Sequence, residues 1–169
     1  AFITLHETRR NTLLRVLQDN TVLKNKIQNY TIPQKEFFTF TTSDGVELNG
    51  YMIKPVNFNN SARYPVIIAQ YSGPGSQKVR DSWGGVTWEH YLATQGFLVA
   101  SVDPRGTGAR GEDFKKITYM QLGNYESKDM IETVKYLSTF PYVEKSKIGI
   151  YGWSYGGFVT CLSMGKGGE

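Results

Sequence analysis

The chain has 169 residues, of which 40% are apolar and 14% aromatic, so it can bury one sizeable core and we expect a single globular domain. No run of about 18 apolar residues occurs, so no membrane-spanning segment is predicted. The formal net charge of +4 comes from scattered basic pairs among acidic residues, which argues against nucleic-acid binding. Two histidines and one cysteine, without a Cys/His cluster, predict neither a metal site nor an internal disulfide.

The opening segment, residues 1–34, differs in pattern from the rest of the chain. Two short strands are expected within residues 2–17, followed by a helix to about residue 28 that Asp19 or Asn20 can cap. A polar break that includes Pro33 ends this segment. It has the character of a tail that belongs to a preceding part of a protein.

From residue 35 onward, strands and helices are expected to alternate. A hairpin over 36–53 turns at Asp44-Gly45, which supplies the positive φ values that tight turns need. Near-continuous apolar runs indicate strands covered on both faces, at 65–71, 97–103 and 147–151. Helices are expected over 88–95, from Asn124 as a cap to Pro141, and after residue 154, with a long loop over 104–123. This alternation predicts an α/β fold with a doubly wound, mostly parallel sheet.

The stretch Gly152–Gly156 (Gly-Trp-Ser-Tyr-Gly) directly follows the last of these strands and has the form of a nucleophile elbow. A sharp strand-to-helix turn would expose the Ser154 hydroxyl to a base, and the glycines leave room for the turn. The backbone N–H of Tyr155, at the start of the next helix, can face a developing oxyanion. We therefore predict that Ser154 is a catalytic nucleophile. Cys161, on the same apolar helix, is expected to be a buried thiol.

A second candidate donor to the oxyanion is Tyr71, at the end of the first core strand. Lipases and esterases carry an oxyanion loop at this place, and a phenol can donate a neutral O–H there. A half-buried structural tyrosine is the alternative. Residues 106–111 match Gly-x-Gly-x-x-Gly, but no second strand ending in an acidic residue follows about 20 residues later. We interpret these glycines as shaping a loop, and no cofactor is predicted.

The activating partners of Ser154 are missing from this pattern. An α/β-hydrolase carries its acid and its histidine after the serine, and residues 155–169 contain neither histidine nor aspartate. His90 is the nearest imidazole in sequence, and we expect it on the solvated side of a helix. The nucleophile is therefore predicted without its base.

Four motifs in order resemble the dipeptidyl peptidase IV branch of the prolyl oligopeptidase family, which includes bacterial prolyl tripeptidyl peptidases. They are Tyr-Ser-Gly-Pro-Gly-Ser-Gln-Lys at 71–78, Asp-Pro-Arg-Gly-Thr-Gly at 103–108, Gly-Asn-Tyr-Glu-Ser-Lys-Asp at 123–129 and Gly-Trp-Ser-Tyr-Gly-Gly-Phe at 152–158. The resemblance implies that Ser154 is the nucleophile, that Tyr155 gives its N–H and lines the S1 pocket, and that Tyr71 is the second oxyanion donor. Pro104 is a departure, because relatives usually carry glycine there.

The resemblance also implies a domain organisation. Residues 1–34 look like the linker between a β-propeller and a hydrolase domain, and residues 35–169 look like the N-terminal half of that hydrolase domain. The expected structure is thus a partial α/β-hydrolase fold with an N-terminal β-hairpin, truncated after the elbow helix. The chain is expected to be an inactive fragment of a serine exopeptidase that releases N-terminal di- or tripeptides after proline or alanine.

Two other functions remain open: another serine hydrolase, such as an esterase or acylaminoacyl peptidase, and a non-catalytic association module. The expected partners are a peptide with a penultimate proline or alanine and, through the open edge of strand 147–151, further copies of this chain. The resemblance implies a periplasmic or cell-envelope location, with the cytoplasm as the alternative.

Overall fold

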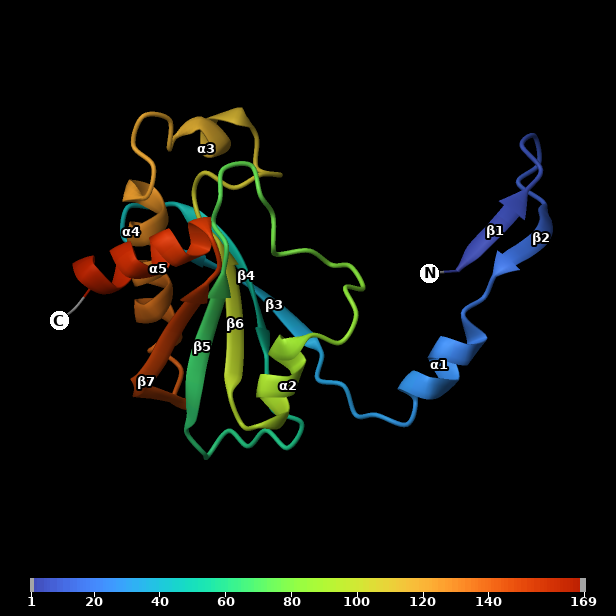
Figure 1. Cartoon of the computed structure of the whole chain (residues 1–169), viewed down its shortest axis with the longest axis horizontal. Coiled ribbons are helices and arrows are strands. Elements are labelled where there is room, and N and C mark those ends of the chain that lie inside the picture. The colour runs from blue at the N-terminus through green and yellow to red at the C-terminus, as the bar shows by residue number, and fades with distance from the viewer. Residues whose placement is uncertain (1, 168–169) are drawn as a thin grey trace. The chain divides into compact units, whose positions relative to one another are not determined.

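The computed structural model describes residues 2–167 and divides the chain into two compact units, Ala1–Ile32 and Pro33–Glu169 (Figure 1). The first unit contains an antiparallel pair, β1 (Ile3–His6) and β2 (Leu13–Gln18), followed by helix α1 (Thr21–Ile27). These elements agree with the expected strands and helix. All six residues of β2 are exposed, and none of residues 2–32 is buried.

The second unit is built on a five-stranded sheet with the order β3-β4-β6-β5-β7. Its strands are β3 (Lys35–Thr41), β4 (Glu47–Ile53), β5 (Tyr64–Gln70), β6 (Leu98–Asp103) and β7 (Val143–Gly152). β4 runs antiparallel to both β3 and β6, whereas β5 pairs in parallel with β6 and β7. All strands except β4 therefore point the same way, and the predicted hairpin and mostly parallel sheet are confirmed.

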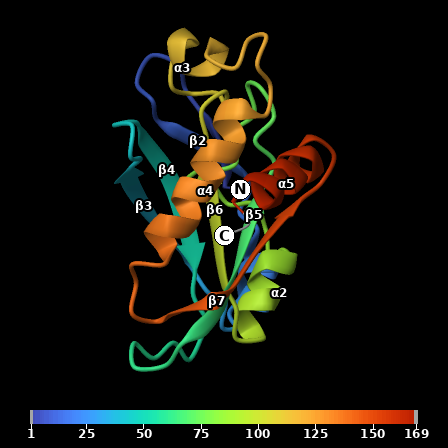
Figure 2. The ribbon, with the colours of Figure 1, turned by 90° about the vertical axis from the view of Figure 1, so that its left-hand side faces the viewer.

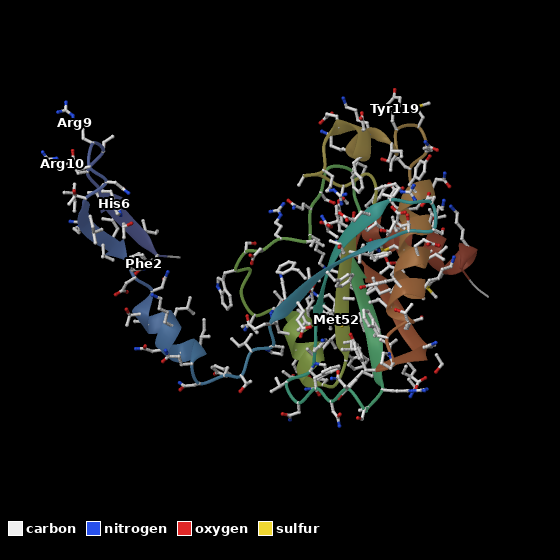
Figure 3. The ribbon with its side chains drawn as sticks, turned by 180° about the vertical axis from the view of Figure 1, so that it is seen from behind. Phe2, His6, Arg9, Arg10, Met52 and Tyr119 are labelled. Atoms are coloured by element: carbon white, nitrogen blue, oxygen red, sulfur yellow. The ribbon has the colours of Figure 1, made fainter. Side chains whose placement is uncertain are left out.

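Helices cover both faces of this sheet. They are α2 (Trp88–Thr94), α4 (Asn124–Leu137) and α5 (Tyr155–Lys166), whereas the short helix α3 (Glu112–Lys116) lies beyond the ends of the strands (Figure 1). Met130 and Leu137 of α4 and Val159 of α5 are buried in the larger core, which includes Met52 of β4 (Figure 3). A smaller core joins Ala93 of α2 to the opposite sheet face, and in Figure 2 strands β5 and β6 lie between α4 and α2. The sheet is thus doubly wound.

Three local expectations are wrong. The stretch 104–123 is not a continuous loop, because it contains the short helix α3. Gly123, with φ of 82°, occupies the N-cap of α4, so Asn124 is the first helical residue and not the cap. β7 begins at Val143, earlier than the apolar run suggested, because the polar residues of its first half stay exposed at the sheet edge. Among the described residues, no helix is long and apolar enough to cross a membrane.

Candidate active site

Ser154 lies in the turn between the end of β7 and the start of α5, and its side chain is exposed. Its backbone adopts φ of 54° and ψ of −119°, a left-handed φ that L-residues rarely adopt. A residue held in such a region stores about 1–3 kcal/mol, and the surrounding structure must enforce it. The strain places the hydroxyl at the carboxyl end of the parallel strands, as the elbow pattern predicts.

Two glycines allow this turn to close. A Cβ atom on Gly152 would collide with the carbonyl group of Gly156. A Cβ atom on Gly156 would lie 2.7 Å from the carbonyl oxygen of Gln70 and 3.1 Å from the Cα atom of Tyr71. The first turn of α5 is therefore pressed directly against the end of β5.

This close approach brings the two candidate oxyanion donors together. Tyr71 follows the last residue of β5 and is 43% exposed, and its ring centroid lies 6.4 Å from that of Tyr155. A Cβ atom on Gly73 would collide with the Tyr71 ring, so the glycine lets this ring fold back over its own loop. Tyr155 opens α5, where the first N–H groups of a helix have no partner within it. All three residues predicted for the site thus lie where β5, β7 and α5 meet.

The Tyr155 side chain is anchored by a carboxyl group that the sequence analysis did not single out. Its hydroxyl donates a 2.6 Å hydrogen bond to Oε1 of Glu126, in the first turn of α4. Burial raises the pKa of Tyr155, and the neighbouring carboxyl group raises it further. Glu126 is fully buried, and its Oε2 atom has no hydrogen-bond partner within the described part of the chain. Glu126 therefore fixes the position of the Tyr155 hydroxyl group.

Two loops next to β5 and β6 support the site. Gly75 N–H donates to the carbonyl of Gly106, and Gly108 N–H donates to the carbonyl of Ser76. A Cβ atom on Gly108 would lie 2.8 Å from the Gly75 carbonyl oxygen, so no larger residue fits there. Gly106 and Gly108 thus shape a loop contact, in keeping with our interpretation of that motif. Pro104 takes part too, because its carbonyl accepts hydrogen bonds from the backbone and hydroxyl of Thr107.

A cluster of charged groups around the buried Arg105 fixes the second of these loops. Arg105 is 3% exposed, and its Nε atom donates to Asp129 of α4 at 3.0 Å. Its NH1 group donates to Asp44 in the β3–β4 turn at 2.9 Å, and its guanidinium lies 4.6 Å from the Tyr125 ring centroid. The 103–108 and 123–129 motifs contain Arg105, Tyr125 and Asp129, but Asp44 lies in neither motif, and no local pattern links it to the others.

Two expectations for reactive side chains are wrong. His90 is only 8% exposed, because its Nδ1 atom accepts the backbone N–H of Thr87 and closes the first turn of α2. Burial lowers the pKa of His90. The hydrogen-bond partner of the His90 ring is Thr87, at the start of the same helix, and not Ser154. Cys161 is exposed, because it lies on the side of α5 away from the core. Among the described residues, no cluster of His, Cys, Asp or Glu could hold a metal ion.

A strained serine between a parallel strand and a helix, on a sheet of this strand order, defines the class: the second unit is a partial α/β-hydrolase fold. The sequence matches the profile of the prolyl oligopeptidase family over residues 85–169. It is 38% identical to dipeptidyl peptidase 4 of Sus scrofa, over 97% of this chain and 21% of that protein. The chain belongs to the prolyl oligopeptidase family of serine peptidases, in its dipeptidyl peptidase IV branch.

Two solved structures of peptidases share the fold of this chain. The crystal structure of Porphyromonas gingivalis dipeptidyl peptidase 4 matches with a TM-score of 0.92 and 45% identity, over 98% of this chain and 24% of that chain. The acylaminoacyl peptidase of Pyrococcus horikoshii matches with a TM-score of 0.74 and 26% identity, over 89% of this chain and 24% of that chain. The chain thus spans between a fifth and a quarter of the length of these relatives.

Proposed function

We propose that these 169 residues are part of a serine exopeptidase that releases N-terminal di- or tripeptides after proline, or less well after alanine. The observation that carries this proposal is the strained Ser154, with Tyr71 and Tyr155 beside it. The similarity to dipeptidyl peptidases supports the choice of substrate. The expected partner is a peptide with a penultimate proline or alanine.

In this proposal the Ser154 hydroxyl attacks the carbonyl carbon of the scissile peptide bond. The Tyr155 N–H and the Tyr71 hydroxyl stabilise the resulting oxyanion, and the Tyr155 ring lines the pocket for the proline side chain. Expulsion of the leaving amine gives an acyl-enzyme, which water then hydrolyses. A base must take the Ser154 proton and return it to the leaving amine. We place this base and its acidic partner outside these 169 residues.

Covalent labelling of the full-length protein tests the nucleophile. A fluorophosphonate should modify Ser154, as peptide mass spectrometry can show, and Ser154→Ala should abolish both labelling and turnover of a Gly-Pro anilide. A full-length protein that resists the probe and has no hydrolytic activity would support a non-catalytic association module instead.

The likeness to an acylaminoacyl peptidase favours one rival substrate class. An enzyme of that kind would hydrolyse peptides with acylated N-termini. A comparison of kcat/KM for a Gly-Pro anilide with kcat/KM for an acetylated alanine anilide distinguishes the two substrate classes. Preference for the acetylated substrate would contradict the exopeptidase assignment but leave the role of Ser154 intact.

A further inference from the structure

Gln70 is a buried amide at the junction of β5 and the elbow. It is the last residue of β5 and is 3% exposed. Along this strand Val66 and Ile68 belong to the core shared with α4 and α5, so Gln70, two residues further on, faces the same side. An amide in that position must find hydrogen-bond partners, because burial without them costs about 1–3 kcal/mol.

The Gln70 side chain forms hydrogen bonds both to α5 and to the loop that follows β5. Its Nε2 atom donates to the Gly156 carbonyl at 2.7 Å and to Oγ1 of Thr160 at 3.1 Å, both on α5. Its Oε1 atom accepts the Ser72 hydroxyl at 2.7 Å. A carbonyl oxygen can only accept, so the amide NH₂ must face Gly156 and the orientation of the side chain is fixed.

These contacts join the two candidate oxyanion donors. Tyr71 directly follows Gln70 in the chain, and Gly156 directly follows Tyr155. The amide therefore ties the strand end that carries the Tyr71 hydroxyl to the helical turn that carries the Tyr155 N–H. In α5 the Gly156 carbonyl can also accept a hydrogen bond from within the helix, so satisfying this carbonyl does not by itself require Gln70.

We propose that Gln70 is a positioning residue of the oxyanion hole, which sets the separation between the Tyr71 hydroxyl and the Tyr155 N–H. This inference rests on the proposed function. Oxyanion donors act at about 2.7–3.1 Å from the negative oxygen, and a displacement of about 1 Å can reduce a rate about 100-fold. Because Gln70 is buried, it does not contact the substrate and acts only by positioning these two donors.

The deciding variant is Gln70→Met in the full-length protein, because methionine nearly matches glutamine in shape but makes no amide hydrogen bond. We expect kcat for a Gly-Pro anilide to fall about 10- to 100-fold with KM changed less than about threefold, since the donors act mainly in the transition state. The affinity for a proline boronate, which forms a tetrahedral serine adduct, should fall by a similar factor. A merely structural glutamine would lower the melting temperature and leave both values near those of the wild type.

One control matches this change. Gln121→Met alters an exposed glutamine that takes no part in the contacts of Gln70, and it should keep kcat within about threefold of the wild type. In a Tyr71→Phe background, Gln70→Met should cost less than it does alone, because one of the groups it positions is already absent.

A folded Gln70→Met protein with wild-type kcat, or an equal loss in both backgrounds, would overturn the inference. If Gln70→Met does not fold, Gln70→Asn decides, since it keeps an amide one methylene shorter: reduced kcat supports the inference and unchanged kcat overturns it. The proposed function fails separately, if Ser154→Ala retains turnover.

Discussion

The elbow glycines are not equivalent, although the sequence Gly-Gly at 156–157 presents them as neighbours. A Cβ atom at Gly156 would lie 2.7 Å from the Gln70 carbonyl oxygen, whereas at Gly157 its nearest contact would be the Gly152 carbonyl oxygen at 3.4 Å. The first distance forces the backbone to shift, and the second is close to ordinary van der Waals contact. Gly156 is thus the residue that lets α5 approach β5.

Gly156→Ala should therefore destabilise the full-length protein by about 1–3 kcal/mol and reduce kcat, because a group is forced into a packed junction beside Ser154. Gly157→Ala is the matched control. It should be neutral or stabilising by up to about 1 kcal/mol, because alanine favours a helix interior over glycine. Thermal unfolding and kcat for a Gly-Pro anilide test both variants, and equal effects would contradict the distinction.

Tyr71→Phe tests the role of the hydroxyl directly. In the full-length protein we expect kcat to fall about 10²- to 10³-fold with little change in KM, because a donor used chiefly in the transition state has been removed. Steady-state kinetics with a proline anilide measure this effect. A kcat within about threefold of the wild type would make Tyr71 a structural tyrosine.

At the scale of the elements, long-range polar contacts hold the site together. The Asp44 carboxylate, in the turn between β3 and β4, accepts hydrogen bonds from Lys128 of α4 and from Arg105 after β6. Together with the hydroxyl of Thr42, these donors hold the pKa of Asp44 well below its ordinary value of 3.8. The turn, the loop and the helix are therefore joined by one charged group.

The lowered pKa gives a pH dependence with a definite sign. Stabilisation by the Asp44 carboxylate is fully present above pH 3.8, the ordinary pKa, and is lost as the pH falls through the lower pKa of the folded state. Asp44→Asn should thus lower the melting temperature at neutral pH and flatten its decline below about pH 4. Asp113→Asn, on the exposed surface of α3, makes the same change in charge and should leave the profile as in the wild type. Parallel profiles for all three proteins would contradict a role for Asp44.

The accuracy of the sequence-based predictions follows from how local each signal is. The core strands and the elbow could be predicted because a continuous apolar run and the spacing of glycines are both properties of residues that are close in sequence. Gln70 and Glu126 were missed because each meets its partner across the fold: Gln70 lies 86 positions before Gly156, and Glu126 lies 29 before Tyr155. His90 was misplaced for a different reason, because a local capping contact to Thr87, three residues earlier, buries a side chain that its polarity assigns to solvent.

At the scale of the whole molecule, β7 is an edge strand of the described sheet, because it pairs with β5 alone. Beside it, Met164 of α5 is 66% exposed. A cavity of about 180 Å³ lies between α4, β7 and α5 and is lined mainly by apolar side chains, including Met164. Unpaired strand edges beside apolar surface favour association with another chain.

The 169-residue chain in isolation should therefore associate with further copies of itself through β7 and the exposed side of α5. Burial of this surface at about 25 cal/mol per Å² of apolar area would favour the association by several kcal/mol. Light scattering after size exclusion at micromolar concentration should give a mass above the 19.1 kDa of one chain.

Met164→Lys should shift the equilibrium toward the monomer, because a charge would enter the contact. Met120→Lys, at a residue that is 87% exposed and belongs to neither β7 nor α5, should not. A wild-type chain that stays monomeric and unfolds cooperatively would show that this edge is stable without a partner.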